Sequence, residues 1–153
     1  MDFSLHRNFK SIIILVFLFL LIQCKKSNSV NLVMEEPFPE KLSDWNLFIG
    51  KLSDLKPNQG VIPYNLNMAL FSDYASKSRF IWMPQGKSAE YKEEDTFNFP
   101  PGTIISKTFY FEGASIGDLK HPNKLIETRL LVNGTNGWIA LPYIWDKDLQ
   151  DAT

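Results

Sequence analysis

Cysteine is nearly absent from this chain, since Cys24 is the only one in 153 residues. An internal disulfide, a CxxC redox pair, a zinc knuckle and a CxxCH haem-attachment site each need at least two cysteines, so all four are excluded. Histidine is almost as scarce, with only His6 and His121. A metal site built on several histidines is therefore excluded as well. A Ser-His-Asp triad would depend on His121 alone, and because no nucleophile motif accompanies it, we expect the chain not to be an enzyme.

An excess of positive charge is also missing. The chain has 16 Lys and Arg against 17 Asp and Glu, which gives a formal net charge of −1. Proteins that bind nucleic acid usually carry a basic patch or stripe, and none stands out here. We therefore expect no nucleic-acid partner.

Apolar runs long enough to cross a membrane are absent too. The longest apolar run lies at the start of the chain. Residues 12–22 are apolar without interruption, but about 20 residues are needed to cross a bilayer comfortably. Arg7 and Lys10 precede this run, a pattern typical of a secretory signal. The run ends in Leu21-Ile22-Gln23-Cys24, which resembles the lipobox of bacterial lipoproteins, although Gln23 stands where that family usually has a small residue.

The lipobox resemblance implies that Cys24 becomes the lipidated first residue of the mature protein. The alternative is an uncleaved membrane anchor, and in both cases we expect an exported, membrane-attached protein of the bacterial cell envelope. We accordingly divide the chain into a signal peptide at 1–23, a tether at 24–41 and a β-rich domain at 42–153.

The domain itself has the composition of an antiparallel β structure. Residues 103–111, 125–132 and 138–143 are rich in β-branched, aromatic and aliphatic side chains, and each is bounded by turn residues. Residues 133–137 contain Asn and Gly, so the last two segments are predicted to form a hairpin. No long helix separates the segments, which argues against a parallel sheet.

Short helical turns and a further strand pair are expected before this region. Ser43 is a suitable N-cap for a short helix over residues 44–48, and residues 53–55 favour another turn. A strand at 79–83 is predicted to pair with residues 88–92 across a Pro-Gln-Gly turn. The predicted fold is thus mainly β, an antiparallel sheet or sandwich with one or two short N-terminal helices.

One charged pair is predicted within the strand at 125–132. Glu127 and Arg129 alternate with period two, so they share a face with Leu125 and Leu131. We interpret them as a structural ion pair. No second carboxylate at a fixed spacing supports an acid-base site.

Several short strings in the domain point to a family. They are Leu42-Ser43-Asp44-Trp45, Pro63-Tyr64-Asn65-Leu66-Asn67, Leu70-Phe71-Ser72-Asp73-Tyr74-Ala75, Phe99-Pro100-Pro101-Gly102-Thr103, Lys107-Thr108-Phe109, Glu127-Thr128-Arg129-Leu130-Leu131, Gly137-Trp138, Pro142-Tyr143-Ile144-Trp145 and Asp151-Ala152. Together they resemble the amino-terminal part of a poorly characterised family of bacterial periplasmic di-haem c-type cytochromes. In that family the CxxCH motifs follow the segment that corresponds to residues 142–152, whereas this sequence stops at Thr153.

The resemblance implies a β domain without its haem-bearing part, and therefore no cofactor in this chain. Three roles remain open. The first is a truncated or split family member with an interaction or structural role. The second is an electron-transfer protein whose haem part lies on another chain. The third is a module that binds envelope ligands by stacking on its aromatic residues. If a haem-bearing partner is missing, we expect Pro142, Tyr143, Ile144 and Trp145 to be exposed as a patch.

Overall fold

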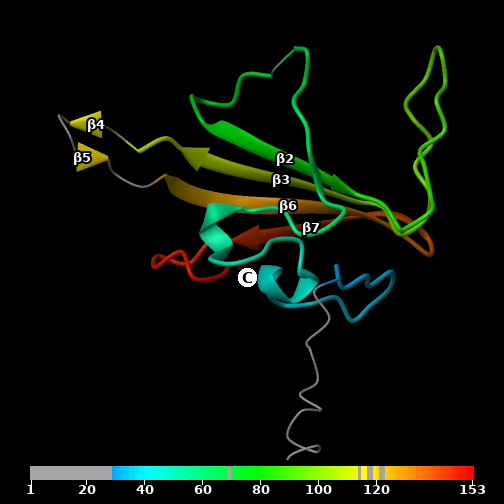
Figure 1. Ribbon diagram of the computed structural model, residues 1–153, viewed down its shortest axis with the longest axis horizontal. Coiled ribbons are helices and arrows are strands. Elements are labelled where there is room, and N and C mark those ends of the chain that lie inside the picture. The colour runs from blue at the N-terminus through cyan, green and yellow to red at the C-terminus, as the bar shows by residue number, and fades with distance from the viewer. Residues whose placement is uncertain (1–28, 69, 114, 117–118, 121–122) are drawn as a thin grey trace, which may run out of the picture.

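The computed structural model describes residues 29–153 except residues 69, 114, 117–118 and 121–122 (Figure 1). The predicted signal peptide, Cys24 and His121 lie outside the described residues. Within the described part, the elements follow in the order η1 (Leu42–Trp45), η2 (Leu52–Asp54), β1 (Ile62–Pro63), β2 (Ser76–Trp82), β3 (Ile104–Phe111), β4 (Ser115–Ile116), β5 (Leu119–Lys120), β6 (Lys124–Gly134) and β7 (Gly137–Ile144).

The described strands form one five-stranded antiparallel sheet in the order β1-β2-β3-β6-β7, with β4 and β5 as a separate two-stranded ribbon. This confirms the prediction of a mainly β fold and of a β6–β7 hairpin. The hairpin turn passes close to the N-terminal segment, because a Cβ added at Gly134 would lie 2.5 Å from the carbonyl oxygen of Met34. Only glycine fits at that approach.

The predicted helices are short 3₁₀ turns in the part of the chain described. Asn46 has a φ of 56° and Leu55 a φ of 48°, so the left-handed backbone ends each turn after three or four residues. Ser43 is not the N-cap that the sequence suggested. Its hydroxyl instead donates to the Asp151 carboxylate at 2.6 Å, which ties η1 to the C-terminal segment.

The prediction that residues 88–92 pair with β2 is wrong. β2 lies between β1 and β3, and Glu90 forms an isolated bridge with Asn98 within a separate hairpin that projects from the sheet (Figure 1). The physical reason is burial. β3 offers β2 a seven-residue partner with buried side chains, whereas residues 88–92 are mostly exposed and have little apolar surface to bury.

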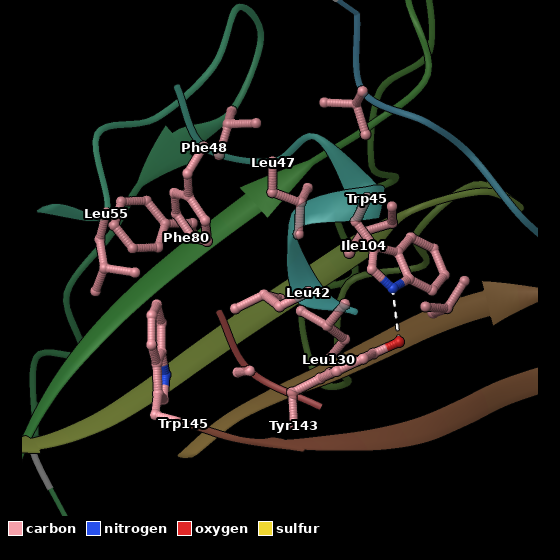
Figure 2. Close-up of a cluster of buried hydrophobic side chains, with 14 of the residues drawn as sticks. Leu42, Trp45, Leu47, Phe48, Leu55, Phe80, Ile104, Leu130, Tyr143 and Trp145 are labelled. Carbon is pink, nitrogen blue, oxygen red and sulfur yellow. Dashed lines mark hydrogen bonds between the residues drawn. The ribbon is translucent and has the colours of Figure 1, made fainter. Parts of the chain in front are cut away.

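The hydrophobic core lies on one side of the sheet, the core face, between the strands and the segment that carries η1 and η2 (Figure 2). Trp45, Leu42 and Leu130 are completely buried there. The indole of Trp45 donates to the Tyr143 hydroxyl at 2.7 Å, and that hydroxyl donates to the Pro39 carbonyl at 2.6 Å. The polar atoms of both large rings are thus satisfied inside the core.

The described part of the predicted tether packs on this domain. Val30 belongs to the buried core cluster, and the backbone N–H of Asn31 donates to the Trp45 carbonyl at 2.9 Å. Among the described residues, no helix has the length and apolar character needed to cross a membrane.

Candidate functional site

The candidate site is the opposite side of the sheet, which we call the open face. Along each strand, side chains alternate between the core face and the open face. In β6, Thr128, Leu130 and Val132 are buried, whereas Arg129 and Leu131 are exposed. The open face is therefore built from the following side chains: Lys77, Arg79 and Ile81 of β2, Ile105, Lys107 and Phe109 of β3, Glu127, Arg129 and Leu131 of β6, and Ala140, Pro142 and Ile144 of β7.

A row of cations crosses the open face. The register places Arg79 opposite Lys107 and Lys107 opposite Arg129, so three adjacent strands present one cation each at the same level. Pro142 of β7 completes the row at the sheet edge. Like charges directly opposite each other destabilise a sheet, so this arrangement is not explained by the stability of the free fold.

The next row holds Phe109 opposite Glu127. The Lys107 ammonium and the Arg129 guanidinium each lie 5.0 Å from the centre of the Phe109 ring, at cation–π distance. Glu127 forms an ion pair with Arg129. Phe109 and Glu127 thus fix the positions of two of the cations, while Glu127 offsets the charge of one.

The structure brings the predicted pair Glu127 and Arg129 together, but not in the setting expected from period two. Their side chains are 17% and 56% exposed, so Arg129 extends into solvent. Leu125 does not share their face. The register shifts between Phe109 and Tyr110, Leu125 pairs with Tyr110, and Leu125 is buried with the core. This bulge adds one extra residue to β6 between Leu125 and Glu127. Leu125 therefore points to the core face, although it is two residues from Glu127.

The centre of the open face is hollowed into a groove of about 680 Å³. Its floor contains the cation row and apolar side chains from three strands, among them Ile105, Leu131 and Pro142. Tyr64 and Leu66 from the loop after β1 form one wall. Pockets that hold ligands span roughly 300–1,000 Å³, so the groove has the size of a binding site.

The loop between β1 and β2 extends the apolar part of this surface. Leu70, Phe71 and Tyr74 are 75%, 75% and 89% exposed. The Lys77 ammonium donates to the Leu70 carbonyl at 2.5 Å, which holds the loop against the edge of the open face. Three large apolar side chains of this loop are therefore exposed to solvent.

The electrostatics of the groove reflect its crowding with positive charge. Burial lowers the pKa of the Lys107 amine, and the neighbouring Arg129, Arg79 and Lys77 lower it further, whereas Glu127 acts in the opposite direction. Burial raises the pKa of the Tyr64 hydroxyl, and Arg79 partly offsets that effect. The charged form of Lys107 is thus destabilised in the groove, and an incoming anion would stabilise it.

Comparison with protein-family models, curated proteins and solved structures finds no match to this chain. The site must therefore be interpreted from its own geometry. Among the described residues, no group of three or more His, Cys, Asp or Glu side chains is placed to hold a metal ion.

The patch expected at residues 142–145 is only half present. Pro142 and Ile144 are exposed on the open face, whereas Tyr143 and Trp145 are buried in the core at 4% and 7% exposure. Strand alternation is the reason, because four consecutive residues of a strand cannot all point to one side. The cation row was not expected from the sequence. Lys77 and Arg79 alternate with Ser78 and Phe80, and Lys107 lies between Ser106 and Thr108, but the alignment of the three cations requires the register between strands.

Proposed function

We propose that this chain is a non-enzymatic interaction module of the bacterial cell envelope. In this proposal a lipid on Cys24 holds it to the membrane, and it carries no haem of its own. Its open face docks a partner protein that presents carboxylates among apolar side chains. The resemblance to the amino-terminal part of di-haem cytochromes supports the cell-envelope setting.

The observation that carries the proposal is the composition of the open face. Leu131 and Ile144 are 42% and 56% exposed on the sheet, and Leu131 lines the groove together with Leu66, Ile105 and Pro142. Contiguous exposed apolar surface on a soluble domain is typical of an interaction site. Interface cores are enriched in aromatic side chains and arginine, both of which this face contains.

Charge complementarity specifies the partner. Of the charged side chains that the structure places on the open face, four are cations and one, Glu127, is a carboxylate that is already paired with Arg129. An acidic surface would therefore be drawn to this face, and a basic one would be repelled.

The docking proposal is tested with a photo-crosslinking amino acid placed at Leu131, in the full chain expressed in its native envelope. Gln150, exposed in the C-terminal loop, is the matched control position. We expect one discrete protein adduct from position 131, lost in Lys107→Glu and weakened by high salt, and none from position 150. A haem-bearing protein as the adduct would identify the alternative partner. Adducts of equal yield from both positions, or adducts insensitive to Lys107→Glu, would contradict the proposal.

The anchor is tested separately with labelled palmitate. Several acyl chains hold a protein firmly to a membrane, whereas a single one binds only marginally. We expect label in the wild type and none in Cys24→Ala. Equal labelling of both proteins would remove the lipoprotein part of the proposal and leave the docking part intact.

The haem-free part is tested by the absorption spectrum of protein purified from its native envelope. Covalent attachment of c-type haem requires thioether bonds to cysteine, and Cys24 would be acylated. We expect no Soret band after acid-acetone extraction. A band that survives this treatment would show covalent haem and overturn this part.

A further inference from the structure

A second exposed surface on this chain is complementary to the open face. The hairpin that joins β2 to β3 projects from the sheet (Figure 1). Its tip contains Glu93, Glu94 and Asp95 in an exposed acidic run. The run is flanked by Tyr91 and Phe97, which are 72% and 50% exposed. This tip presents carboxylates among apolar side chains, which is the chemistry that the open face would recognise.

The carboxylates of the tip are available for an intermolecular contact. Asp95 pairs with Lys92 at 3.7 Å, between side chains that are 66% and 47% exposed. Glu93 and Glu94 form no ion pair with any residue that the structure describes. Likewise, Arg79 and Lys107 form no ion pair within the described chain. Each surface therefore leaves unpaired charges of opposite sign.

The hairpin is supported from below by a ladder of aromatic rings. Tyr91 contacts Phe97 with ring centres 5.9 Å apart, Phe97 contacts Phe99 at 6.1 Å, and Phe99 contacts Trp138 of β7 at 6.2 Å. The last two contacts are edge-on. The ladder connects the hairpin to the sheet and limits the freedom that the tip would lose on binding, which favours association.

We propose that the acidic, aromatic tip at residues 91–97 of one copy docks in the cationic groove of a second copy of this chain. Arg79 and Lys107 of the groove receive the carboxylates of Glu93 and Glu94, and the apolar floor receives an aromatic ring of the tip. The inference rests on the proposed function, since it names a second copy as the protein that the open face binds. Every copy offers both surfaces, so the contact either closes a two-fold dimer or repeats along a chain of copies.

The burial of Lys107 supports this assignment. An anion beside Lys107 would offset the charges that lower its pKa, namely those of Arg129, Arg79 and Lys77. The four cations of the open face outnumber its single carboxylate, Glu127, so the face as a whole attracts the carboxylates of the tip.

The experiment uses two charge reversals in the chain that carries its own signal and anchor, purified in mild detergent. Glu94→Lys disables the tip and Lys107→Glu disables the groove. Sedimentation velocity of the wild type at rising concentration should show association. Each single variant should associate at least about tenfold more weakly than the wild type, because like charges then meet at the contact. Asp148→Lys and Lys147→Glu reverse the same charges in the exposed C-terminal loop, and they should associate as the wild type does.

The decisive measurement is a mixture of the two disabled chains in low salt. Glu94→Lys retains an intact groove and Lys107→Glu retains an intact tip, so the mixture should form a one-to-one complex at concentrations where each chain alone stays monomeric. A double variant that carries both reversals should regain self-association, because the charges are then exchanged across the same contact. Restoration of this kind cannot result from misfolding of either single variant.

Three results would overturn the inference. A wild type that stays monomeric at all concentrations would do so, and so would association that is unchanged by both reversals, or a mixture that shows no complex. A monomeric wild type that still forms a discrete adduct with another protein from position 131 would overturn self-docking and leave the proposed function standing.

Discussion

The two faces of the sheet use neighbouring residues of the same strands for opposite purposes. In β6, Leu130 is completely buried and Leu131 is 42% exposed, although they are adjacent leucines. On the core face, the large buried rings have hydrogen-bonded polar atoms, as in the contact between Trp45 and Tyr143. The open face instead aligns three cations and leaves apolar groups in solvent. The first arrangement stabilises the fold, and the second is what a binding surface requires.

The largest expected effect contrasts the two leucines. Leu130→Ala should lower the free energy of unfolding by about 2–5 kcal/mol, because it leaves a cavity in the core. Leu131→Ala should change it by less than about 1 kcal/mol, since its side chain already meets water. Denaturant unfolding of both variants measures the difference. Equal losses would mean that the open face is covered in the free chain.

The next effect concerns the buried hydrogen bonds of the core face. The Thr128 hydroxyl accepts from the Trp145 indole at 3.0 Å and lies 2.7 Å from the Thr108 hydroxyl. Thr128→Val keeps the shape but leaves the indole N–H unpaired, so unfolding should become easier by about 1–3 kcal/mol. Thr135→Val, in the exposed hairpin turn, is the matched control and should have almost no effect. If Thr128→Val behaves like the control, the network does not stabilise the core.

Ser106 offers a change of opposite sign on the same face. Its hydroxyl is buried and has no hydrogen-bond partner among the described residues. Ser106→Ala removes a polar atom that is desolvated without compensation, so stability should rise by about 1 kcal/mol. Thermal unfolding of the variant tests this. A lower melting temperature would indicate that the hydroxyl is satisfied in solution.

The ion pair between Glu127 and Arg129 on the open face should contribute less to the stability of the fold than the buried groups of the core face. Arg129 is 56% exposed, and exposed pairs are worth roughly 0–1 kcal/mol. Arg129→Ala should therefore barely change the melting temperature, while it weakens binding at the open face. A large loss of stability with unchanged binding would assign Glu127 and Arg129 to the fold alone, as the sequence analysis expected.

The smallest effect is the pH dependence due to Lys107. Its pKa is lowered in the folded chain, so the unfolded chain binds more protons as the pH approaches 10.5. The contribution of Lys107 therefore makes the fold more stable as the pH rises through this window. Burial raises the pKa of Tyr64 and Tyr143, which acts in the opposite direction, so only the difference between wild type and Lys107→Met is informative. Parallel pH profiles for the two proteins would contradict the lowered pKa that burial and the neighbouring cations give Lys107.

Much of the fold could be predicted from residue types alone. The segments at 103–111, 125–132 and 138–143 correspond to β3, β6 and β7, and the Asn-Gly turn between the last two is where the structure has it. Local chemistry was sufficient there, because β-branched and aromatic residues bounded by turn residues favour strands wherever they pack. The strand predicted at 79–83 and the helix predicted at 44–48 differ in extent from β2 and η1, since long-range pairing decides the first and the backbone angle at Asn46 the second.

The candidate site could not be predicted because it depends on register. The residues of the cation row lie on three strands, and β2 and β3 are separated by the hairpin at residues 83–103. Nothing in the sequence aligns Arg79 with Lys107 across such a connection. The bulge opposite Phe109 and Tyr110 likewise decides that Leu125 faces the core, and a bulge leaves no clear signal in a single sequence.

The most direct test of the open face as a docking surface is a lysine footprint in the cell envelope, the proposed setting of this chain. Lys107 and Lys77 lie on that face, whereas Lys51 and Lys147 are exposed elsewhere. Amine acetylation is measured first in intact envelopes and then on dilute purified protein. The account predicts that Lys107 and Lys77 are protected in the envelope and become reactive after dilution, while Lys51 and Lys147 react equally in both. Equal labelling of all four lysines under both conditions would contradict it.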